Sequence, residues 1–174
     1  MLNIDNTTII CIDIQDKLVN MLNRSEYIKN NVIKLMKTAS ILDINAIVTE
    51  QYPKGLGSTI EEIKAVKKFN TIEKTTFSAI QTESFPEIKS QNIIIFGIET
   101  HICVYQTALD LLNLGKKVYI VADCCASRNE YNHMTALNAL GQQGAVIETL
   151  EMVLFQFLKS SKHPNFKEIQ KLII

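Results

Sequence analysis

The sequence predicts an α/β protein with a three-layer, doubly wound (Rossmann-like) fold around a mostly parallel six-stranded sheet. Short apolar runs rich in β-branched residues alternate with segments of helical periodicity about six times along the chain. Two of these runs end in an acid, Asp13 and Asp123, as expected where strands reach the carboxyl edge of a parallel sheet. We expect the strand order 3-2-1-4-5-6, which six such units commonly adopt.

The composition fits a single domain spanning residues 1–174. Hydrophobic residues make up 47% of the chain, enough to fill a core. The 18 Lys and Arg residues balance 18 Asp and Glu residues, so no basic surface favours nucleic acid, and a net charge of zero tolerates self-association. We find neither a secretory signal pattern nor an apolar run of membrane-spanning length, and therefore expect a cytoplasmic protein without a membrane or nucleic-acid partner.

The expected strands are short apolar runs bounded by polar or turn residues. In chain order they cover residues 7–13, 45–50, 69–73, 92–96, 117–123 and 145–148. Gly97 is expected to break the fourth strand, and the Pro and Gly residues of positions 51–57 predict a loop. Lys74 directly follows the third strand, where a lysine is usually solvated.

The expected helices carry apolar residues at helical spacing between capping signals. They cover residues 25–42, 58–66, 103–114, 129–140, 152–158 and 166–172. Ser25 is placed to cap the first helix, and Ser58-Thr-Ile-Glu61 has the pattern of a capping box. Ser78 is placed to cap a short helical turn, and Gly115 has the position of a C-terminal glycine.

Asp13 and Cys103 are the first candidates for a functional site. In the expected strand order, strands one and four are neighbours at the switch point, where ligands bind beyond the carboxyl ends. Asp13 ends the first strand, and Cys103 follows the fourth where the chain enters a helix. A helix N-terminus lowers a thiol's pKa and offers N–H groups to an oxyanion. The alternatives are a helix-capping role for Asp13 and a small buried hydrophobe for Cys103.

Nucleotide binding is disfavoured by the loop after the first strand. It reads Ile14-Gln-Asp-Lys17, with neither a G-x-G-x-x-G nor a G-x-x-x-x-G-K-[ST] pattern. Gly55-Leu-Gly57 lies in another loop and lacks the third glycine. We expect no cofactor.

Several segments together resemble the isochorismatase-like cysteine hydrolase superfamily, in its branch of isochorismatase-domain-containing proteins. They are Asp13 with Gln15, Lys74-Thr-Thr-Phe-Ser78, Gly97-Ile-Glu-Thr-His-Ile-Cys103, Thr49-Glu-Gln-Tyr-Pro-Lys-Gly-Leu-Gly57, Gln106-Thr-Ala-Leu-Asp-Leu-Leu112 and Ala122-Asp-Cys-Cys-Ala-Ser-Arg128. The likeness runs from about residue 7 to residue 172, nearly the whole chain.

The resemblance implies a triad and an oxyanion hole. Asp13 is then the general acid/base, Lys74 the cation beside the thiol, and Cys103 the nucleophile. The backbone N–H groups of Glu99 and Cys103 would form the oxyanion hole, next to a cis peptide at Ile98–Glu99. The implied reaction is hydrolysis of a C–N bond in a small amide or carbamoyl compound through a thioester. A nearby ammonium and a helix N-terminus each lower a thiol's pKa, so we expect a poised Cys103 thiolate.

Two departures from the family's better-known members narrow this function. Nicotinamidases of the family carry histidine metal ligands near the second strand, whereas residues 50–57 here contain no histidine. His101, His133 and His163 are not spaced as ligands either, so we expect no metal and disfavour nicotinamide as the substrate. Isochorismatases proper act on a vinyl ether without the cysteine, so Cys103 argues against that reaction.

Other residues have weaker signals. Gln15, Glu50, Phe77 and Tyr105 are candidate pocket residues, with capping or core packing as the alternative. Asp123 is expected to order the loop into Ser127 and Arg128, and His101 to have a structural role.

Two other function classes remain as alternatives. The first is a catalytically silent protein of this fold that serves as an oligomeric binding or scaffold protein. The second is redox sensing by Cys103 or by Cys124 and Cys125, although adjacent cysteines seldom form a disulfide. The four cysteines, which include Cys11, lack metal-type spacing and are interpreted as reduced thiols. The apolar helices near the C-terminus favour a homo-oligomer, a dimer or larger.

Overall fold

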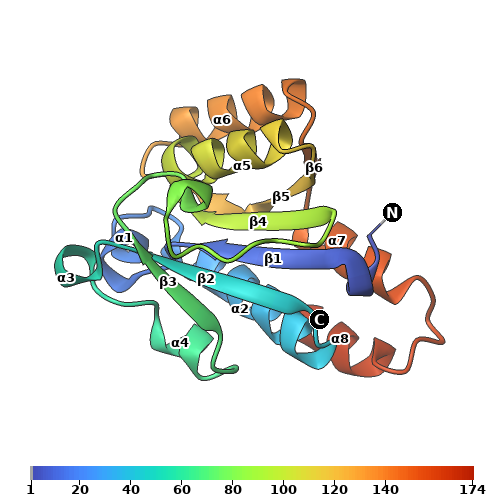
Figure 1. Cartoon of the computed structure of the whole chain (residues 1–174). Coiled ribbons are helices and arrows are strands. Elements are labelled where there is room, and N and C mark those ends of the chain that lie inside the picture. The colour runs from blue at the N-terminus through green and yellow to red at the C-terminus, as the bar shows by residue number, and fades with distance from the viewer. Residues whose placement is uncertain (1) are drawn as a thin grey trace.

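The computed structural model describes residues 2–174 and contains one six-stranded sheet, with every neighbouring pair of strands parallel. The strands are β1 (Thr7–Ile12), β2 (Asn45–Gln51), β3 (Asn70–Lys74), β4 (Asn92–Ile98), β5 (Lys117–Ala126) and β6 (Val146–Glu148). Their order is β3-β2-β1-β4-β5-β6, which confirms the predicted doubly wound topology (Figure 1).

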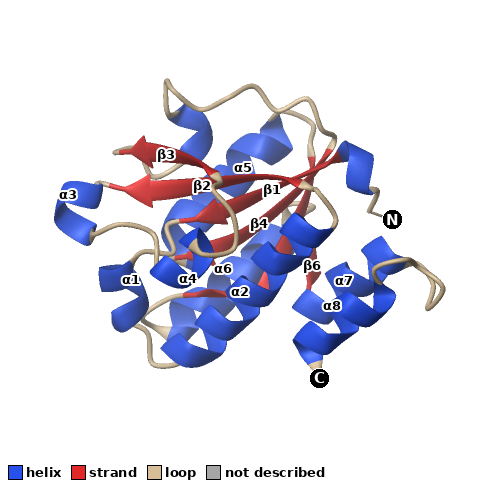
Figure 2. Cartoon of the chain, turned by 90° about the horizontal axis from the view of Figure 1, so that it is seen from below, coloured by secondary structure: helices blue, strands red, loops and turns tan. Residues whose placement is uncertain are grey.

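Helices cover both faces of this sheet and complete the three layers. The α-helices are α1 (Asp16–Asn20), α2 (Ser25–Ile41), α3 (Pro53–Leu56), α4 (Glu61–Lys64), α5 (Tyr105–Asn113), α6 (Glu130–Gln142), α7 (Leu150–Leu158) and α8 (Phe166–Ile173). Two 3₁₀ turns, η1 (Ile4–Asn6) and η2 (Ala79–Gln81), and a π-helical segment, η3 (Thr100–Val104), complete the described elements. Figures 1 and 2 show α5 and α6 on one face and α2, α7 and α8 on the other.

The core is centred on the two middle strands, β1 and β4. Every residue of both strands is buried, as expected for parallel strands covered on two faces. The carboxyl ends of β1 and β4 are therefore fixed side by side, with Ile12 paired to Gly97. Among residues 2–174, no helix has the length and hydrophobicity needed to cross a membrane.

Strands β4 and β5 run two and three residues further than predicted. β4 does not break at Gly97 but continues to Ile98, because glycine accepts the φ of +135° that the chain adopts there. β5 does not end at Asp123 but continues to Ala126, because its register with β4 shifts between Ile95 and Gly97. Asp123 therefore lies inside a strand, and its carboxylate accepts the Leu150 N–H at 2.7 Å instead of ordering the loop after β5.

The predicted capping box at residues 58–61 is wrong. The backbone N–H and the hydroxyl of Thr59 both donate to Oε1 of Glu50, each at 2.7 Å. Ser58 accepts a hydrogen bond from Lys64, and α4 begins at Glu61 without a side-chain cap. A buried carboxylate needs donors more than a one-turn helix needs a cap, which explains the difference.

The boundary between β4 and the following helices also differs from the prediction. Helical structure begins with η3 at Thr100, so Cys103 lies inside a π-helical turn and not at the first residue of a helix. The peptide bond between Ile98 and Glu99 is cis. Pro53–Leu56, expected as loop, forms the one-turn helix α3.

Substitution of Gly97 should be among the most damaging single changes at the junction of β1 and β4. A Cβ at Gly97 would lie 2.0 Å from the carbonyl oxygen of Ile12. We predict that Gly97→Ala lowers the free energy of unfolding by more than about 3 kcal/mol, from combined strain and overpacking. Chemical denaturation monitored by circular dichroism measures this loss.

Gly115→Ala is the matched control. Gly115 also has a positive φ, +74°, but a Cβ there would meet nothing within 4 Å. Its expected cost is the backbone strain alone, about 1–2 kcal/mol. Equal losses in the two variants would show that the close approach of Gly97 to β1 does not matter.

Candidate active site

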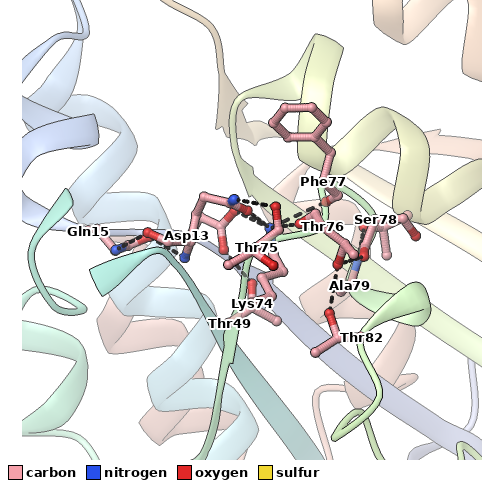
Figure 3. A network of polar contacts seen from close by, with 12 residues as sticks. Asp13, Gln15, Thr49, Lys74, Thr75, Thr76, Phe77, Ser78, Ala79 and Thr82 are labelled. Carbon is pink, nitrogen blue, oxygen red and sulfur yellow. Dashed lines mark hydrogen bonds and ion pairs between the residues drawn. The ribbon is translucent and has the colours of Figure 1, made fainter. Parts of the chain in front are cut away.

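A buried ion pair between Asp13 and Lys74 forms the centre of the candidate site. The Nζ of Lys74 lies 2.7 Å from Oδ2 of Asp13, and both side chains are 0% exposed. Asp13 follows β1 and Lys74 ends β3, so the two groups meet across β2 (Figure 3). The structure thus makes Lys74 a buried partner of Asp13 and not a solvated surface lysine.

The strand between them supplies further hydrogen bonds. The Thr49 hydroxyl donates to Oδ1 of Asp13 at 2.6 Å, and Lys74 donates to Oε1 of Gln51 at 2.6 Å. Thr49 and Gln51 are two positions apart on β2, so their side chains share one face of the sheet. The sequence shows both as polar residues at the carboxyl end of β2, but it does not give the register that directs them to Asp13 and Lys74.

Lys74 also holds the loop that follows β3. Its ammonium donates to the carbonyl oxygens of Thr76 and Phe77, both at 3.3 Å. The loop is further fixed by the Ser78 hydroxyl, which donates to Asp110 at 2.6 Å and does not cap η2. Figure 3 shows the Phe77 ring pointing away from this network, and that ring is 53% exposed.

Cys103 lies close enough to Asp13 and Lys74 that both side chains act on its thiol. The side chain is 6% exposed, and its nearest elements are β4, α5 and α6, which pack against η3. The structure therefore brings together the three residues that the sequence placed in one group.

The predicted depression of the Cys103 pKa is wrong. The pKa is raised from an ordinary 9.0 to about 12, mainly by burial and next by the negative charge of Asp13, while the charge of Lys74 lowers it by less. Lys74 is already paired with Asp13. The negative charge of Asp13 therefore offsets most of the effect that the lysine would have on the pKa of the thiol. The resting group is a neutral thiol beside a carboxylate–ammonium pair.

The segment before Cys103 is held by three contacts with the chain after β5. Oε1 of Glu99 accepts the Arg128 N–H at 2.9 Å, and the Thr100 hydroxyl lies 2.8 Å from Nδ1 of His133. Nδ1 of His101 lies 2.9 Å from the Ser127 hydroxyl, which fits the structural role predicted for His101. Burial lowers the His133 pKa below its ordinary value, which favours a neutral ring in this contact.

The four residues with weaker signals are not equally available to a substrate. Gln15 is fully buried, and its amide group contacts the backbone of Gln51 and Gly57. Glu50 is buried against Thr59. Phe77 is exposed and Tyr105 is half-buried at the start of α5. A substrate contact from Gln15 would require an existing bond to break, whereas Phe77 is free to move.

No group of three or more His, Cys, Asp or Glu side chains within residues 2–174 is arranged to hold a metal ion. All four cysteines are free and buried. Burial is the largest cause that raises the pKa values of Cys11, Cys124 and Cys125. The structure thus gives none of these three thiols the exposed, low-pKa character of a redox sensor.

The fold and this cluster define a doubly wound α/β protein with a buried acid, amine and thiol at the carboxyl edge of its sheet. The isochorismatase domain family matches residues 7–152. Isochorismatase domain-containing protein 2 of Xenopus laevis is 40% identical over 168 residues, covering 93% of this chain and 80% of that protein. The chain belongs to the isochorismatase family.

Solved structures share the fold. The MAR1 ribonuclease of Caenorhabditis elegans is 37% identical with a TM-score of 0.94, covering 99% of this chain and 91% of that one. The Escherichia coli YcaC protein, described as an octameric hydrolase of unknown specificity, has a TM-score of 0.88 over 98% of this chain and 94% of that one. At 22% identity, YcaC shows the fold alone.

The pH dependence of Cys103 alkylation should reflect the raised pKa. With a pKa of about 12, the thiolate fraction grows about tenfold per pH unit throughout the range from pH 7 to 10. Asp13→Asn removes a cause that raises the pKa, so we predict faster labelling at every pH in this range. Labelling with iodoacetamide, followed by peptide mass spectrometry, measures the rate at Cys103 alone. A rate that levels off near neutral pH in the parent would contradict the raised pKa.

Removing one partner of the Asp13–Lys74 ion pair should lower the free energy of unfolding. Lys74→Met leaves the Asp13 carboxylate buried without its cation, and such a loss costs roughly 3–5 kcal/mol of folding stability. The double variant Asp13→Asn, Lys74→Met removes both charges and should recover part of that loss. Urea denaturation of the two single variants and the double variant gives the coupling energy. Additive losses would show that the two side chains do not stabilise each other.

Proposed function

We propose that the chain is a cysteine hydrolase that cleaves a C–N bond in a small amide or carbamoyl compound. The observation that carries this proposal is the Cys103 thiol beside the buried Asp13–Lys74 pair. An enzyme of this class needs a nucleophile, a proton acceptor within reach and a group that keeps the acceptor ionised. Membership of a family that is generally hydrolytic supports the same reading.

Asp13 would act as the base because the thiol is protonated at rest. As Sγ of Cys103 attacks the substrate carbonyl carbon, the thiol proton passes to Asp13. The carbonyl π electrons move to the oxygen, which becomes an oxyanion. The N–H groups of Glu99 and Cys103 are the proposed donors to it, and one such donor is worth roughly 3 kcal/mol in other enzymes.

Collapse of this intermediate would complete the first half of the reaction. The C–N bond breaks, the nitrogen takes the proton from Asp13, and ammonia or an amine leaves while a thioester remains on Cys103. Water then attacks the thioester carbonyl and gives a proton to Asp13. The C–S bond breaks, the thiolate regains the proton, and the carboxylic or carbamic acid departs.

Lys74 would act mainly on Asp13 in this scheme. Its ammonium donates a hydrogen bond to Oδ2 of Asp13 at 2.7 Å, and its charge would be available to the sulfur once Asp13 has taken the proton. Because Cys103 is only 6% exposed, the proposed substrate is a small molecule whose carbonyl group is not flanked by bulky substituents. Glu50, Gln15, Phe77 and Tyr105 remain proposed substrate-binding residues, with Phe77 the most accessible of them.

The ribonuclease name of the Caenorhabditis elegans relative provides a competing activity to test. The balanced charge of this chain does not favour binding of RNA. His101 and His133 each use Nδ1 in a contact within the fold, with Ser127 and Thr100 respectively. Incubation with single-stranded RNA therefore belongs in the same assay series, with no cleavage expected.

We also infer that the chain forms a homo-oligomer. Its zero net charge tolerates close association of copies. Its fold is shared with an octameric hydrolase.

An activated ester tests the nucleophile without knowledge of the substrate. With p-nitrophenyl acetate, we predict a burst of p-nitrophenolate, because the thiol acylates faster than water removes the acetyl group. Intact-mass spectrometry should show one acetyl group, located on Cys103. Cys103→Ala should abolish the burst, and ammonia release from small amides should fall by on the order of 10³-fold or more.

Cys124→Ala is the matched control, since that thiol is buried elsewhere in the core and should leave the burst intact. An unchanged burst in Cys103→Ala would overturn the proposed nucleophile. A folded parent that is never acylated would favour the catalytically silent alternative.

A further inference from the structure

A buried carboxylate at the edge of the sheet lacks a counter-charge. Glu148 ends β6 and is 7% exposed. Its Oε1 accepts a hydrogen bond from Gln156 at 2.6 Å, while its Oε2 has no partner within residues 2–174. None of the ion pairs in the same residues includes Glu148. An enclosed carboxylate without a cation is costly, so this position calls for a cation from outside the chain.

The surface beside Glu148 is one face of helix α7. A shallow cleft of about 640 Å³ there is lined by Glu148, Met152, Phe155, Gln156 and Lys159. The opposite face of α7 is already used, since its remaining large apolar side chains are buried in the core. Met152 and Phe155 are 50% and 45% exposed, so the helix carries apolar side chains on both faces. Figure 2 shows α7 and α8 together at one side of the molecule.

The charges along this face are self-complementary. Glu148 lies just before α7 and Lys159 just after it, and Lys159 has no ion pair among the described residues. Met152 comes four positions after Glu148, and Phe155 four positions before Lys159. Along the row Glu148, Met152, Phe155 and Lys159 the face has acid, apolar, apolar and base at symmetric spacing, with exposed Glu151 and half-buried Gln156 beside this row. A two-fold axis through its middle would place each acid opposite a base.

We propose that α7 pairs with α7 of a second copy of this chain, antiparallel about that two-fold axis. Lys159 of each copy enters the cleft beside Glu148 of the other, and Met152 of each packs on Phe155 of the other. The pairing covers the exposed apolar side chains and supplies the missing cation at both ends. It rests on the homo-oligomer inferred above and assigns one interface of that assembly.

Cross-linking between two variants tests the antiparallel register. Affinity-tagged Met152→Cys chains are mixed with untagged Phe155→Cys chains and oxidised under mild conditions. We expect a disulfide-linked heterodimer, because the native cysteines are all buried and do not compete. The matched control mixes Tyr131→Cys with Met134→Cys, an equally spaced pair on α6 that is 79% and 49% exposed. That control should give no heterodimer above background.

The charge pair is tested by light scattering over a concentration series, with folding checked by circular dichroism. Lys159→Glu should raise the dissociation constant of this contact at least about tenfold, whereas Lys159→Arg should leave it within about twofold. One contrary result is an oligomeric parent whose dissociation constant is unchanged by Lys159→Glu, together with cysteine variants that form no cross-link. That result would overturn this interface but not the homo-oligomer. A parent that stays monomeric at high concentration would overturn the homo-oligomer itself, and neither result bears on the thioester chemistry.

Discussion

The buried contact between Asp13 and Lys74 is the interaction on which the candidate site depends. The two residues are 61 positions apart in the sequence and meet only because β1 and β3 flank β2. The pairing of Gln51 with Lys74 sets the ends of β2 and β3 level, and β1 ends two residues earlier, with Ile12 opposite Thr49. A slip of one residue in either pairing would turn these side chains to opposite faces of the sheet. The ion pair is therefore a product of the register, and its loss would leave a bare charge inside the fold.

The same contact decides where the proton of the thiol resides. An isolated lysine beside Cys103 would favour the thiolate, but this lysine already neutralises a carboxylate. Burial then dominates and raises the pKa of the thiol, which keeps the sulfur protonated until a base removes its proton. In the proposed reaction, such a site would avoid a standing buried thiolate, with its exposure to oxidation, and would generate the nucleophile only as the substrate carbonyl arrives. Asp13 is thereby better suited to proton transfer than Lys74.

Much of the fold could be predicted from the sequence, whereas the catalytic roles of Asp13, Lys74 and Cys103 stay a prediction. The alternation of apolar runs and helical segments indicated a doubly wound sheet, for which 3-2-1-4-5-6 is one common strand order. That order predicted that Asp13 lies near Cys103. The partners of Lys74 could not be predicted, because Gln51 and the carbonyl groups of Thr76 and Phe77 come together only through register and loop geometry. The thiol's raised pKa was missed for a related reason, since it depends on a balance between burial and two opposed charges.

Local signals failed where a tertiary requirement was stronger. Ser58-Thr-Ile-Glu61 matches a capping box, yet Thr59 is used by the buried carboxylate of Glu50. Gly97 resembles a strand terminator, yet it lets β4 pass within contact of the Ile12 carbonyl and continue to Ile98. In the second case glycine accepts the φ of +135° that lets the strand continue. In the first case the buried carboxylate determines the outcome, because leaving it unsatisfied costs more than a lost cap. The same reasoning gives weight to Glu148, whose free oxygen is satisfied by no residue from 2 to 174 and so points beyond the single chain.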